Sequence, residues 1–543
     1  MRLRELLKTP SGKPRLLLPA VVVVVLTFVI GWAALRIVQH TLPDAERAKA
    51  LAHTGRYAAA EEVYVRMLRE TPTAKVAIDL LDNHEHALAM KMLRKLKGKS
   101  GGLRGAAERD EAVMSEEALD ALLEDSLPPD VSLVARFWRA VDKDQMPSGL
   151  REVILVGAEQ EPPLAWHNHL LAREASRHHD MEEAARRYER EGLAFSERSE
   201  DVDRALGIWI AASNWDRVRE RMQDARVAAA AAPITKYQFA VHENDWKNAA
   251  RWLVQAWRPR LVVSSLVMSG IAALAWFFFC ARLGKLGERV RRRLPLYIVA
   301  FVLGVLSIVP TVCLIAVEEA KLHLVETGDP MRDLLFFVFG VGLREEASKL
   351  LLFAPLLLVL RKSGDKLDVL VCGALVGLGF AAEENLGYLA SGDLHTGLGR
   401  FLTANFLHMA MTAILAAALD DFVKDREKYG AAFSRTTVMV VAMHGGYDFL
   451  LSHEEYGGSY FAMAVFFFLV KMFLTAVEHA RRKADRGMTV TQAFLVALAV
   501  VTGASAVYAV AIVGPVQGLL VMTEGLLGVA ILIYCFVTTL REM

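Results

Sequence analysis

The pattern of hydrophobic and polar residues divides the chain into two unlike regions. From about Asp44 to Arg258 the sequence is charged and rich in alanine, its apolar residues recur with helical spacing, and it holds no long apolar run. From Leu261 to the end, apolar runs recur that are long enough for an α-helix to cross a bilayer, which takes about 20 residues. Another apolar run, Leu16–Leu35, precedes the charged region. The pattern predicts an all-α, polytopic membrane protein with a soluble helical domain between its first and second spans.

About ten spans are expected, at residues 16–35, 261–281, 295–317, 334–360, 367–390, 399–420, 434–452, 458–477, 489–512 and 517–539. The loops between them alternate between basic and acidic or nearly neutral, and lysine and arginine gather on the cytoplasmic side of membrane proteins. The first run is too long for a cleaved signal peptide and follows a basic tail, so it reads as a signal anchor. Both termini are therefore expected in the cytoplasm, and the inserted domain on the extracytoplasmic side.

The inserted domain contains a weak internal repeat. Residues 53–72 have an order and spacing that resembles a tetratricopeptide repeat (TPR), in Gly55, Tyr57, Ala60, Tyr64, Leu68 and Pro72. Weaker copies place turns near His179, Ser213 and Asn244, which are 34 and 31 residues apart, close to the TPR period. Residues 41–258 are thus expected to form a TPR-like scaffold that binds a peptide or protein ligand. The alternative is an ordinary alanine-rich helical bundle.

Composition argues against several other functions. The chain has 543 residues and a net charge of +1, with no basic stripe, so nucleic acid is not an expected partner. Its four cysteines lie in or beside apolar runs without a CxxC pair, which supports neither a thiolate zinc site nor a disulfide framework. A histidine cluster in the inserted domain is expected to consist of exposed helix residues rather than metal ligands: His167, His169, His178 and His179.

The segment GLREEASKLLLF, residues 342–353, places four ionisable residues in one predicted span. Such residues are costly in a membrane, and function is a common reason for them. Successive helical residues are about 100° apart, so Glu345 and Glu346 are expected to point in different directions. Glu345 shares a face with Lys349, which Glu346 reaches less directly. We expect Lys349 to neutralise one carboxylate while the other faces a cavity. A purely structural ion pair is the alternative.

Three later spans carry polar motifs of their own. In GFAAEENLGY, residues 379–388, Glu384 shares a stripe with Gly373 and Gly377, which would let another helix approach closely. The next two motifs are TANFLHMAMTA, with Asn405, His408 and Thr412, and AMHGGYDFL, with His444 and Asp448. At a rise of 1.5 Å per residue, Glu384, His408 and His444 fall roughly 9–14 Å from the outer boundary, near the level of the glutamate pair. The common depth predicts one shared site.

In their order on successive spans, these motifs resemble those of the PrsW family of intramembrane proteases, which is related to the CAAX prenyl proteases and the bacterial Abi proteins. The resemblance rests on EEASK (345–349), FAAEEN (380–385), His408 and HGGYD (444–448), and covers roughly residues 295–480. It implies hydrolysis of a single-pass membrane protein, such as an anti-sigma factor, near the extracytoplasmic face. The expected location is the bacterial inner membrane, with the repeat domain in the periplasm.

The hydropathy pattern and the resemblance together divide the chain, and the resemblance assigns its site residues. The expected parts are 1–40, tail and signal anchor; 41–258, TPR-like domain; 259–480, protease core; and 481–543, two further spans. Glu345 and Glu346 would supply the general base, His444 with Asp448 would stabilise the oxyanion, and His408 would complete the cluster. Glu384 stands where the prenyl proteases carry a histidine. The expected catalytic residues are Glu345, Glu346, Glu384, His408 and His444, supported by Lys349, Asn385 and Asp448.

Two protease mechanisms suit these residues. Glutamate-activated water without a cofactor is favoured, because the sequence has no HExxH motif. The alternative is zinc, whose catalytic sites use histidine and carboxylate ligands and keep a position open for water. Its ligands would be Glu345, Glu384, His408 and His444. Two other functions remain open, a non-catalytic receptor or scaffold that uses the repeat domain and a proton-coupled transporter. A transporter would be expected to show inverted repeats, and none is seen.

Overall fold

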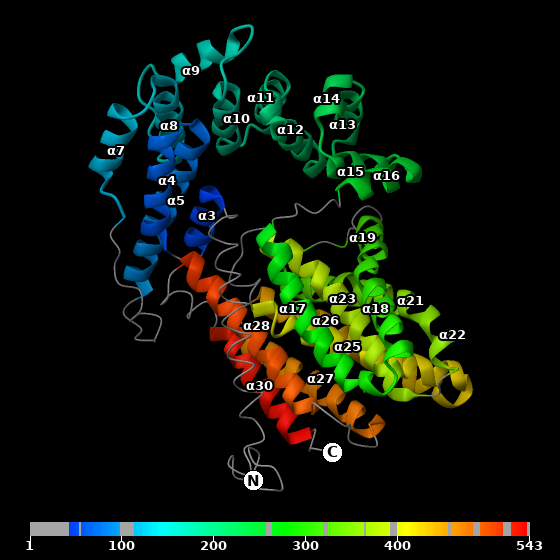
Figure 1. Cartoon of the computed structure of the whole chain (residues 1–543). Coiled ribbons are helices and arrows are strands. Elements are labelled where there is room, and N and C mark those ends of the chain that lie inside the picture. The colour runs from blue at the N-terminus through cyan, green and yellow to red at the C-terminus, as the bar shows by residue number, and fades with distance from the viewer. Residues whose placement is uncertain are drawn as a thin grey trace. The chain divides into compact units, whose positions relative to one another are not determined.

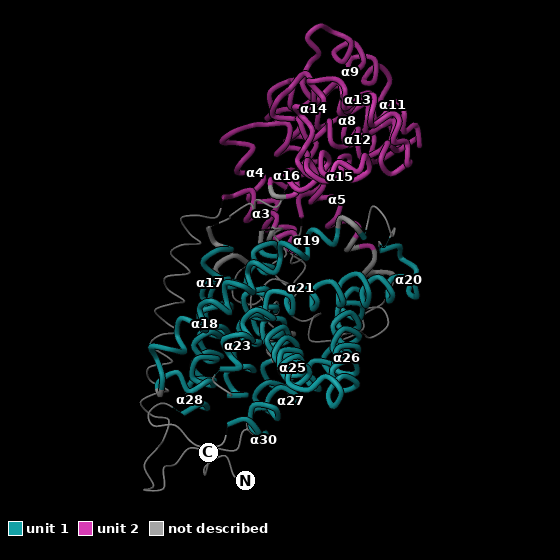
Figure 2. Tube along the Cα trace, turned by 90° about the vertical axis from the view of Figure 1, so that its right-hand side faces the viewer, with its two compact units in different colours: residues 1–42, 259–543 teal, residues 43–258 magenta. Residues whose placement is uncertain are grey.

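In the computed structural model, all regular secondary structure of the described residues is helical (Figure 1). The structure describes residues 43–53, 56–97, 113–256, 263–318, 324, 326–362, 365–390, 399–453, 458–481, 489–513 and 523–539. The predicted first span and Gly55 lie outside these ranges. The chain divides into two compact units, residues 43–258 and residues 1–42 with 259–543 (Figure 2). The predicted all-α class is confirmed, while the functions assigned to the ranges stay predictions.

The described residues of the unit 43–258 form a series of helices, several of which are joined by tight turns. Its helices are α3 (Asp44–His53), α4 (Tyr57–Glu70), α5 (Ala74–Lys97), α7 (Glu116–Asp125), α8 (Pro129–Asp142), α9 (Leu150–Glu159), α10 (His167–Arg177), α11 (Met181–Ala194), η1 (Ser196–Arg198), α12 (Glu200–Ala211), α13 (Trp215–Met222), α14 (Ala225–Ala230), α15 (Pro233–His242) and α16 (Trp246–Ala256).

Four of these turns have the same construction. Asp144, His179, Ser213 and Asn244 have positive φ angles of 52°, 60°, 56° and 59°. At each turn the next residue donates its N–H to a carbonyl five residues back, for example Asp180 to Ala175 at 2.9 Å and Asp245 to Ala240 at 2.8 Å. This bond belongs to the Schellman motif that ends many helices. Hairpin turns thus occur at the three predicted positions, and the assignment to the TPR class stays a prediction.

The histidines of this unit differ from expectation. His178 and His179 are exposed at a turn, but His167 and His169 are buried. The Nδ1 atom of His169 lies 2.9 Å from an Asp201 oxygen, and its ring contacts Trp138, Trp166 and Tyr188. The prediction of four exposed histidines is wrong for these two, because helix packing encloses one face of α10. None of the four belongs to a metal-ligand group among the described residues.

A buried carboxyl group lies beside this histidine. Glu191 of α11 is fully buried, accepts the backbone N–H of Trp166 and lies 3.6 Å from Arg198. Burial raises the pKa of Glu191 to about 7, although the Trp166 N–H and the Arg198 charge act in the opposite direction. Between about pH 4.5 and pH 7 the folded unit therefore holds a proton on Glu191 that the unfolded chain releases.

We expect the stability of this unit to fall between pH 5 and pH 8. The folded pKa of Glu191, about 7, lies above the ordinary value of 4.5, so its stabilising contribution is lost as pH rises through 7. The loss is about 2–3 kcal/mol. Thermal unfolding of the full-length protein, followed by tryptophan fluorescence at both pH values, measures it. Glu191→Gln should remove this part of the pH dependence, and an unchanged difference in the variant would contradict the prediction.

The second unit consists mainly of long apolar helices. The helices that the structure describes in this unit, short ones included, are α17 (Val263–Leu283), η2 (Leu286–Glu288), α18 (Val290–Leu306), α19 (Ile308–Val317), α20 (Pro330–Leu335), the π-helix η4 (Phe336–Gly342), α21 (Leu343–Phe353), η5 (Ala354–Leu356), α22 (Leu357–Leu360), α23 (Lys366–Ala390), α25 (Ala404–Lys424), α26 (Arg426–Ser452), α27 (Gly458–Ala480), α28 (Val490–Val513) and α30 (Thr523–Thr539).

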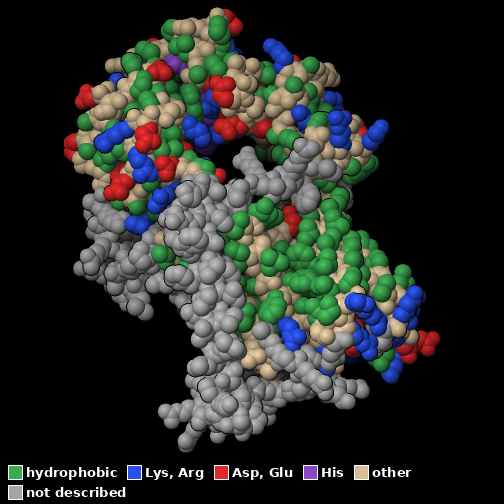
Figure 3. Space-filling model, viewed as in Figure 1, with side chains coloured by type: hydrophobic (Ala, Val, Ile, Leu, Met, Phe, Trp, Pro, Cys, Tyr) green, Lys and Arg blue, Asp and Glu red, His purple; other side chains and the backbone are tan. Residues whose placement is uncertain are grey.

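Among the described residues, 5 helices are long and apolar enough to cross a membrane: Ser265–Leu283, Val290–Ile315, Ala404–Lys424, Tyr460–Ala480 and Val490–Val510. Hydrophobic side chains cover much of this unit on the face shown in Figure 3. Exposed examples on α17 and α18 include Leu274, Ile298 and Val302. A large exposed apolar surface marks contact with something other than water. The chain is therefore a multi-pass helical membrane protein, while the predicted total of about ten spans stays a prediction.

The helix that carries the glutamate pair is not the single regular span expected at 334–360. It begins as α20, passes through the π-helical residues Phe336–Gly342, continues as α21, and is interrupted again at η5, which contains Pro355. A proline has no N–H to donate, so a break at this position is expected. The π-helical stretch has no such sequence signature. Segments of this kind often lie next to functional sites.

Candidate functional site

Helix α23 crosses the middle of this unit and packs closely against α25. A Cβ atom on Gly377 would collide with the carbonyl oxygen of His408, and one on Gly373 would lie 2.6 Å from the Cβ of Ala416. The predicted role of these two glycines in a close helix approach is therefore confirmed. Their packing places Glu384 of α23 within reach of His408 of α25.

A second close approach brings α26 against the π-helical segment. A Cβ atom on Gly445 would collide with the backbone of Phe337 and Val338, and one on Gly342 would lie 2.6 Å from the carbonyl oxygen of Val441. The residue before Gly445 is His444, and Glu345 lies in the first turn after Gly342. Backbone contact between these helices thus sets the separation between the imidazole and the glutamate pair.

This packing predicts different effects for neighbouring glycines on one helix. Gly445→Ala should destabilise the protein by about 1–3 kcal/mol, the usual effect of overpacking a core. Gly446→Ala should be neutral or slightly stabilising, because no atom lies within 4 Å of the added Cβ and alanine favours helix. Thermal unfolding of the purified variants measures both. Equal melting temperatures for the two variants would contradict the packing argument.

Lys349 lies at the centre of the site. Its Nζ atom is 3.3 Å from Glu345 Oε2, 2.8 Å from Glu346 Oε1 and 2.9 Å from His408 Nδ1. The ammonium also lies 3.8 Å from the centroid of the Phe380 ring, and the side chain is fully buried. The lysine therefore joins the first, second and third sequence motifs.

Both glutamates of the pair also lie near His444. Glu346 Oε1 is 3.0 Å from His444 Nδ1, and Glu345 Oε2 is 3.6 Å from His444 Nε2. The expectation that the two carboxylates diverge, with only one of them held by Lys349, is wrong, because long side chains from neighbouring positions reach opposite nitrogens of one ring. Glu345 remains the more accessible of the two, with 10% of its side chain exposed against 1% for Glu346.

Glu384 has a partner, Arg400, that the sequence did not predict. Its carboxylate forms an ion pair with Arg400, and its Oε2 atom lies 3.1 Å from His408 Nε2. Arg400 also donates to Asn385 Oδ1 at 3.2 Å and lies 4.0 Å from the centroid of the Tyr388 ring. The only signal in the sequence is an arginine at the outer end of a predicted span, where positive charge is not expected.

The remaining predicted residues lie around this cluster. Asp448 Oδ2 is 3.5 Å from His444 Nε2, with 25% of its side chain exposed. Asn385 donates to Asn405 at 2.7 Å. Thr412 lies 3.5 Å from Glu346. The structure thus gathers all predicted catalytic and supporting residues in one place, while their individual roles stay predictions.

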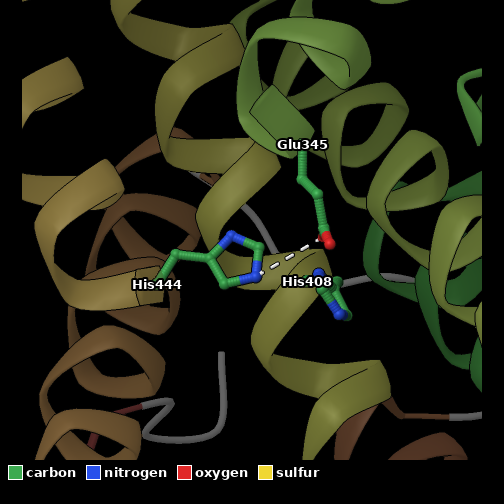
Figure 4. A group of neighbouring side chains, drawn as sticks. All are labelled: Glu345, His408 and His444. Atoms are coloured by element: carbon green, nitrogen blue, oxygen red, sulfur yellow. Dashed lines mark ion pairs between the residues drawn. The ribbon is translucent and has the colours of Figure 1, made fainter. Parts of the chain in front are cut away.

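Three of these side chains can hold a metal ion. Glu345, His408 and His444 are buried, and each offers a ligand atom within 4.8 Å of the other two. Figure 4 shows them converging from three helices, with the Glu345–His444 ion pair dashed. One carboxylate and two imidazoles form a donor set that catalytic zinc sites use, so these residues fit zinc. Glu384, the fourth predicted ligand, lies outside the group because Arg400 and His408 hold it.

Of three comparisons with known proteins, one found a match. Residues 292–475 match the family described as PrsW family intramembrane metalloprotease. The chain matches no curated protein and no solved structure. The match covers all four motifs and leaves the helical unit of residues 43–258 unassigned. Residues 292–475 therefore form a PrsW family intramembrane metalloprotease domain.

Proposed function

We propose that this domain is a metal-dependent protease that hydrolyses peptide bonds of membrane-anchored proteins. The observation that carries the proposal is the buried group of Glu345, His408 and His444, which fits zinc within a domain of a metalloprotease family. The sequence favoured glutamate-activated water without a metal. The donor group and the family description support the zinc alternative better.

In this proposal the three donors hold the ion, and two further carboxylates orient the imidazoles. A bound zinc ion acidifies water and polarises a carbonyl group. The Glu384 carboxylate faces the N–H of His408 Nε2, and Glu346 faces His444 Nδ1, which leaves the opposite ring nitrogens for ligation. Such outer carboxylates fix the tautomer of histidine ligands. Arg400 in turn holds Glu384 in place.

The proton of the attacking water needs an acceptor that water can reach. Asp448 is the most exposed carboxylate among the predicted site residues, and its contact with His444 Nε2 places it beside the donor group. We assign it this role, because a general base must lie within reach of the proton it removes. Glu345, which was expected to supply the general base together with Glu346, is in this scheme a ligand.

A second mechanism is favoured by one observation. The ammonium of Lys349 contacts both glutamates and so offsets one of their two negative charges without a metal. In that case Glu345, the more exposed of the pair, would activate water directly. Chelation of zinc would leave this mechanism active.

The proposed substrate is a single-pass membrane protein, such as an anti-sigma factor, cut near the extracytoplasmic face. Support comes from the outer position of the motifs in the predicted spans and from the distribution of basic loops. The proposed location is a bacterial inner membrane, with residues 43–258 in the periplasm. This helical unit would bind a peptide or protein ligand.

Proteomics of membrane fragments tests the protease proposal without a known substrate. Cells that produce the wild-type chain should contain extracytoplasmic fragments of single-pass proteins that are missing from cells producing Glu345→Gln. The two proteins must accumulate to equal levels in the membrane. Identical fragment sets at equal protein levels would contradict proteolysis. They would favour a non-catalytic receptor or scaffold that uses the helical unit of residues 43–258.

A further inference from the structure

The position of the Lys349 ammonium bears on metal binding. Its Nζ atom is in direct contact with two of the three metal-donor side chains, Glu345 and His408. It also contacts Glu346 and is fully buried. A lysine ammonium has three N–H donors and no acceptor, and these three contacts use all of them. The Lys349 ammonium is therefore a cation that already contacts the donor group.

The position of the ring proton on His408 shows which of its two nitrogens is left to bind a metal. Because an ammonium can only donate, His408 Nδ1 must accept from Lys349, which leaves the ring proton on Nε2. That proton is directed to Glu384, which Arg400 holds. Metal-bound histidines commonly donate the second ring nitrogen to a carboxylate in this way. The nitrogen of His408 left for a metal is thus Nδ1, the one that Lys349 occupies.

A zinc ion and this ammonium cannot use the same donors together. The lone pair of His408 Nδ1 serves either one N–H donor or one metal bond. In addition, two cations a few ångströms apart repel strongly in a buried site of low dielectric constant. For zinc to be held by Glu345, His408 and His444, the Lys349 side chain must leave His408.

We propose that the Lys349 ammonium and a zinc ion are alternative occupants of this donor group. The inference rests on the proposed function, since it assumes that the three donors bind zinc. Lys349 is then a positioning residue: its ammonium holds Glu345, Glu346 and His408 together, and it competes with the ion for them. Zinc binding includes a movement of Lys349 away from His408.

Lys349→Met tests the competition, because methionine keeps much of the chain length and removes the charge. Zinc affinity of the purified full-length protein, measured by competition with a chromophoric chelator, should rise at least about tenfold. In zinc-free buffer the melting temperature should fall, since buried carboxylates lose their partner. Added zinc should recover more of this loss in the variant than it adds to the wild type. A lysine needed only for folding would lower the melting temperature without raising zinc affinity.

Two further variants complete the test. Lys471→Met removes a lysine from α27, where it contacts Thr538 and Thr539, and should leave zinc affinity unchanged. If Lys349→Met does not accumulate, it is combined with Glu346→Gln, so that the double variant loses one buried charge of each sign. The zinc affinity of the double variant is then compared with that of Glu346→Gln alone. The expected increase in zinc affinity is the same.

The outcomes separate the inference from the proposed function. Equal or weaker zinc binding after loss of Lys349 overturns the competition and leaves a zinc protease intact. Absence of zinc binding in every protein overturns both the metal-dependent mechanism and the competition. Zinc binding that appears only after loss of Lys349 supports the competition and shows that the lysine is the resident cation of the wild-type site.

Discussion

Replacement of Glu345 by glutamine is expected to lower cleavage of a membrane substrate by roughly 10³-fold or more, the size of effect seen when a residue essential to the chemistry is lost. The amide keeps the shape of the side chain but removes its negative charge. The carboxylate is the anionic member of the donor group and contacts both Lys349 and His444. Cleavage of a co-expressed single-pass substrate, compared by immunoblot at matched protein levels, measures the change.

A second acidic position serves as the control. Glu326 is exposed and lies outside the site cluster, so Glu326→Gln should retain wild-type cleavage. Glu346→Gln should also be strongly impaired, because its carboxylate contacts Lys349 and His444. Full cleavage by both Glu345→Gln and Glu346→Gln would show that the glutamate pair is structural.

His444→Ala is expected to remove both zinc and activity. The substitution deletes one of the three metal donors. Loss of a residue that only hydrogen-bonds a ligand typically lowers metal affinity 10–100-fold, so we expect the zinc affinity of His444→Ala to fall by at least about 100-fold. Zinc content of the purified protein, measured by inductively coupled plasma mass spectrometry, should fall from about one ion per chain to near zero. Cleavage should fall with it.

An exposed histidine provides the comparison for this variant. His479 of α27 hydrogen-bonds only its own helix, at the Thr475 carbonyl oxygen, among the contacts that the structure describes. His479→Ala should keep full zinc content and activity. If His444→Ala keeps its zinc but loses cleavage, His444 acts in catalysis without holding the ion, and the donor assignment is wrong.

Much of the site could be predicted from sequence because the membrane makes polar residues conspicuous. In an apolar span His408, Glu384 and His444 stand out, and counting residues from the span ends places them at one depth. The positions of the hairpin turns at His179, Ser213 and Asn244 could be predicted for a similar reason. Each turn interrupts a regular pattern, so its position can be read without the tertiary structure.

Other features depend on packing that sequence spacing does not encode. Helical phase separates Glu345 from Glu346, yet both reach His444, because side-chain length and the position of α26 decide the contact. Arg400 belongs to no motif and meets Glu384 only through the close packing of α23 and α25. His169 is buried for the same kind of reason, since other helices cover a face that its own sequence leaves polar.

The most direct test of the account is cleavage by the purified full-length protein in lipid vesicles that contain a single-pass substrate. We predict a cut within or beside the transmembrane segment, located by mass spectrometry of the fragments. Activity should disappear when zinc is removed by a chelator, return when zinc is added back, and be absent from Glu345→Gln throughout. Cleavage that survives complete removal of zinc would contradict the metal-dependent mechanism, and equal cleavage by Glu345→Gln would contradict the assigned site.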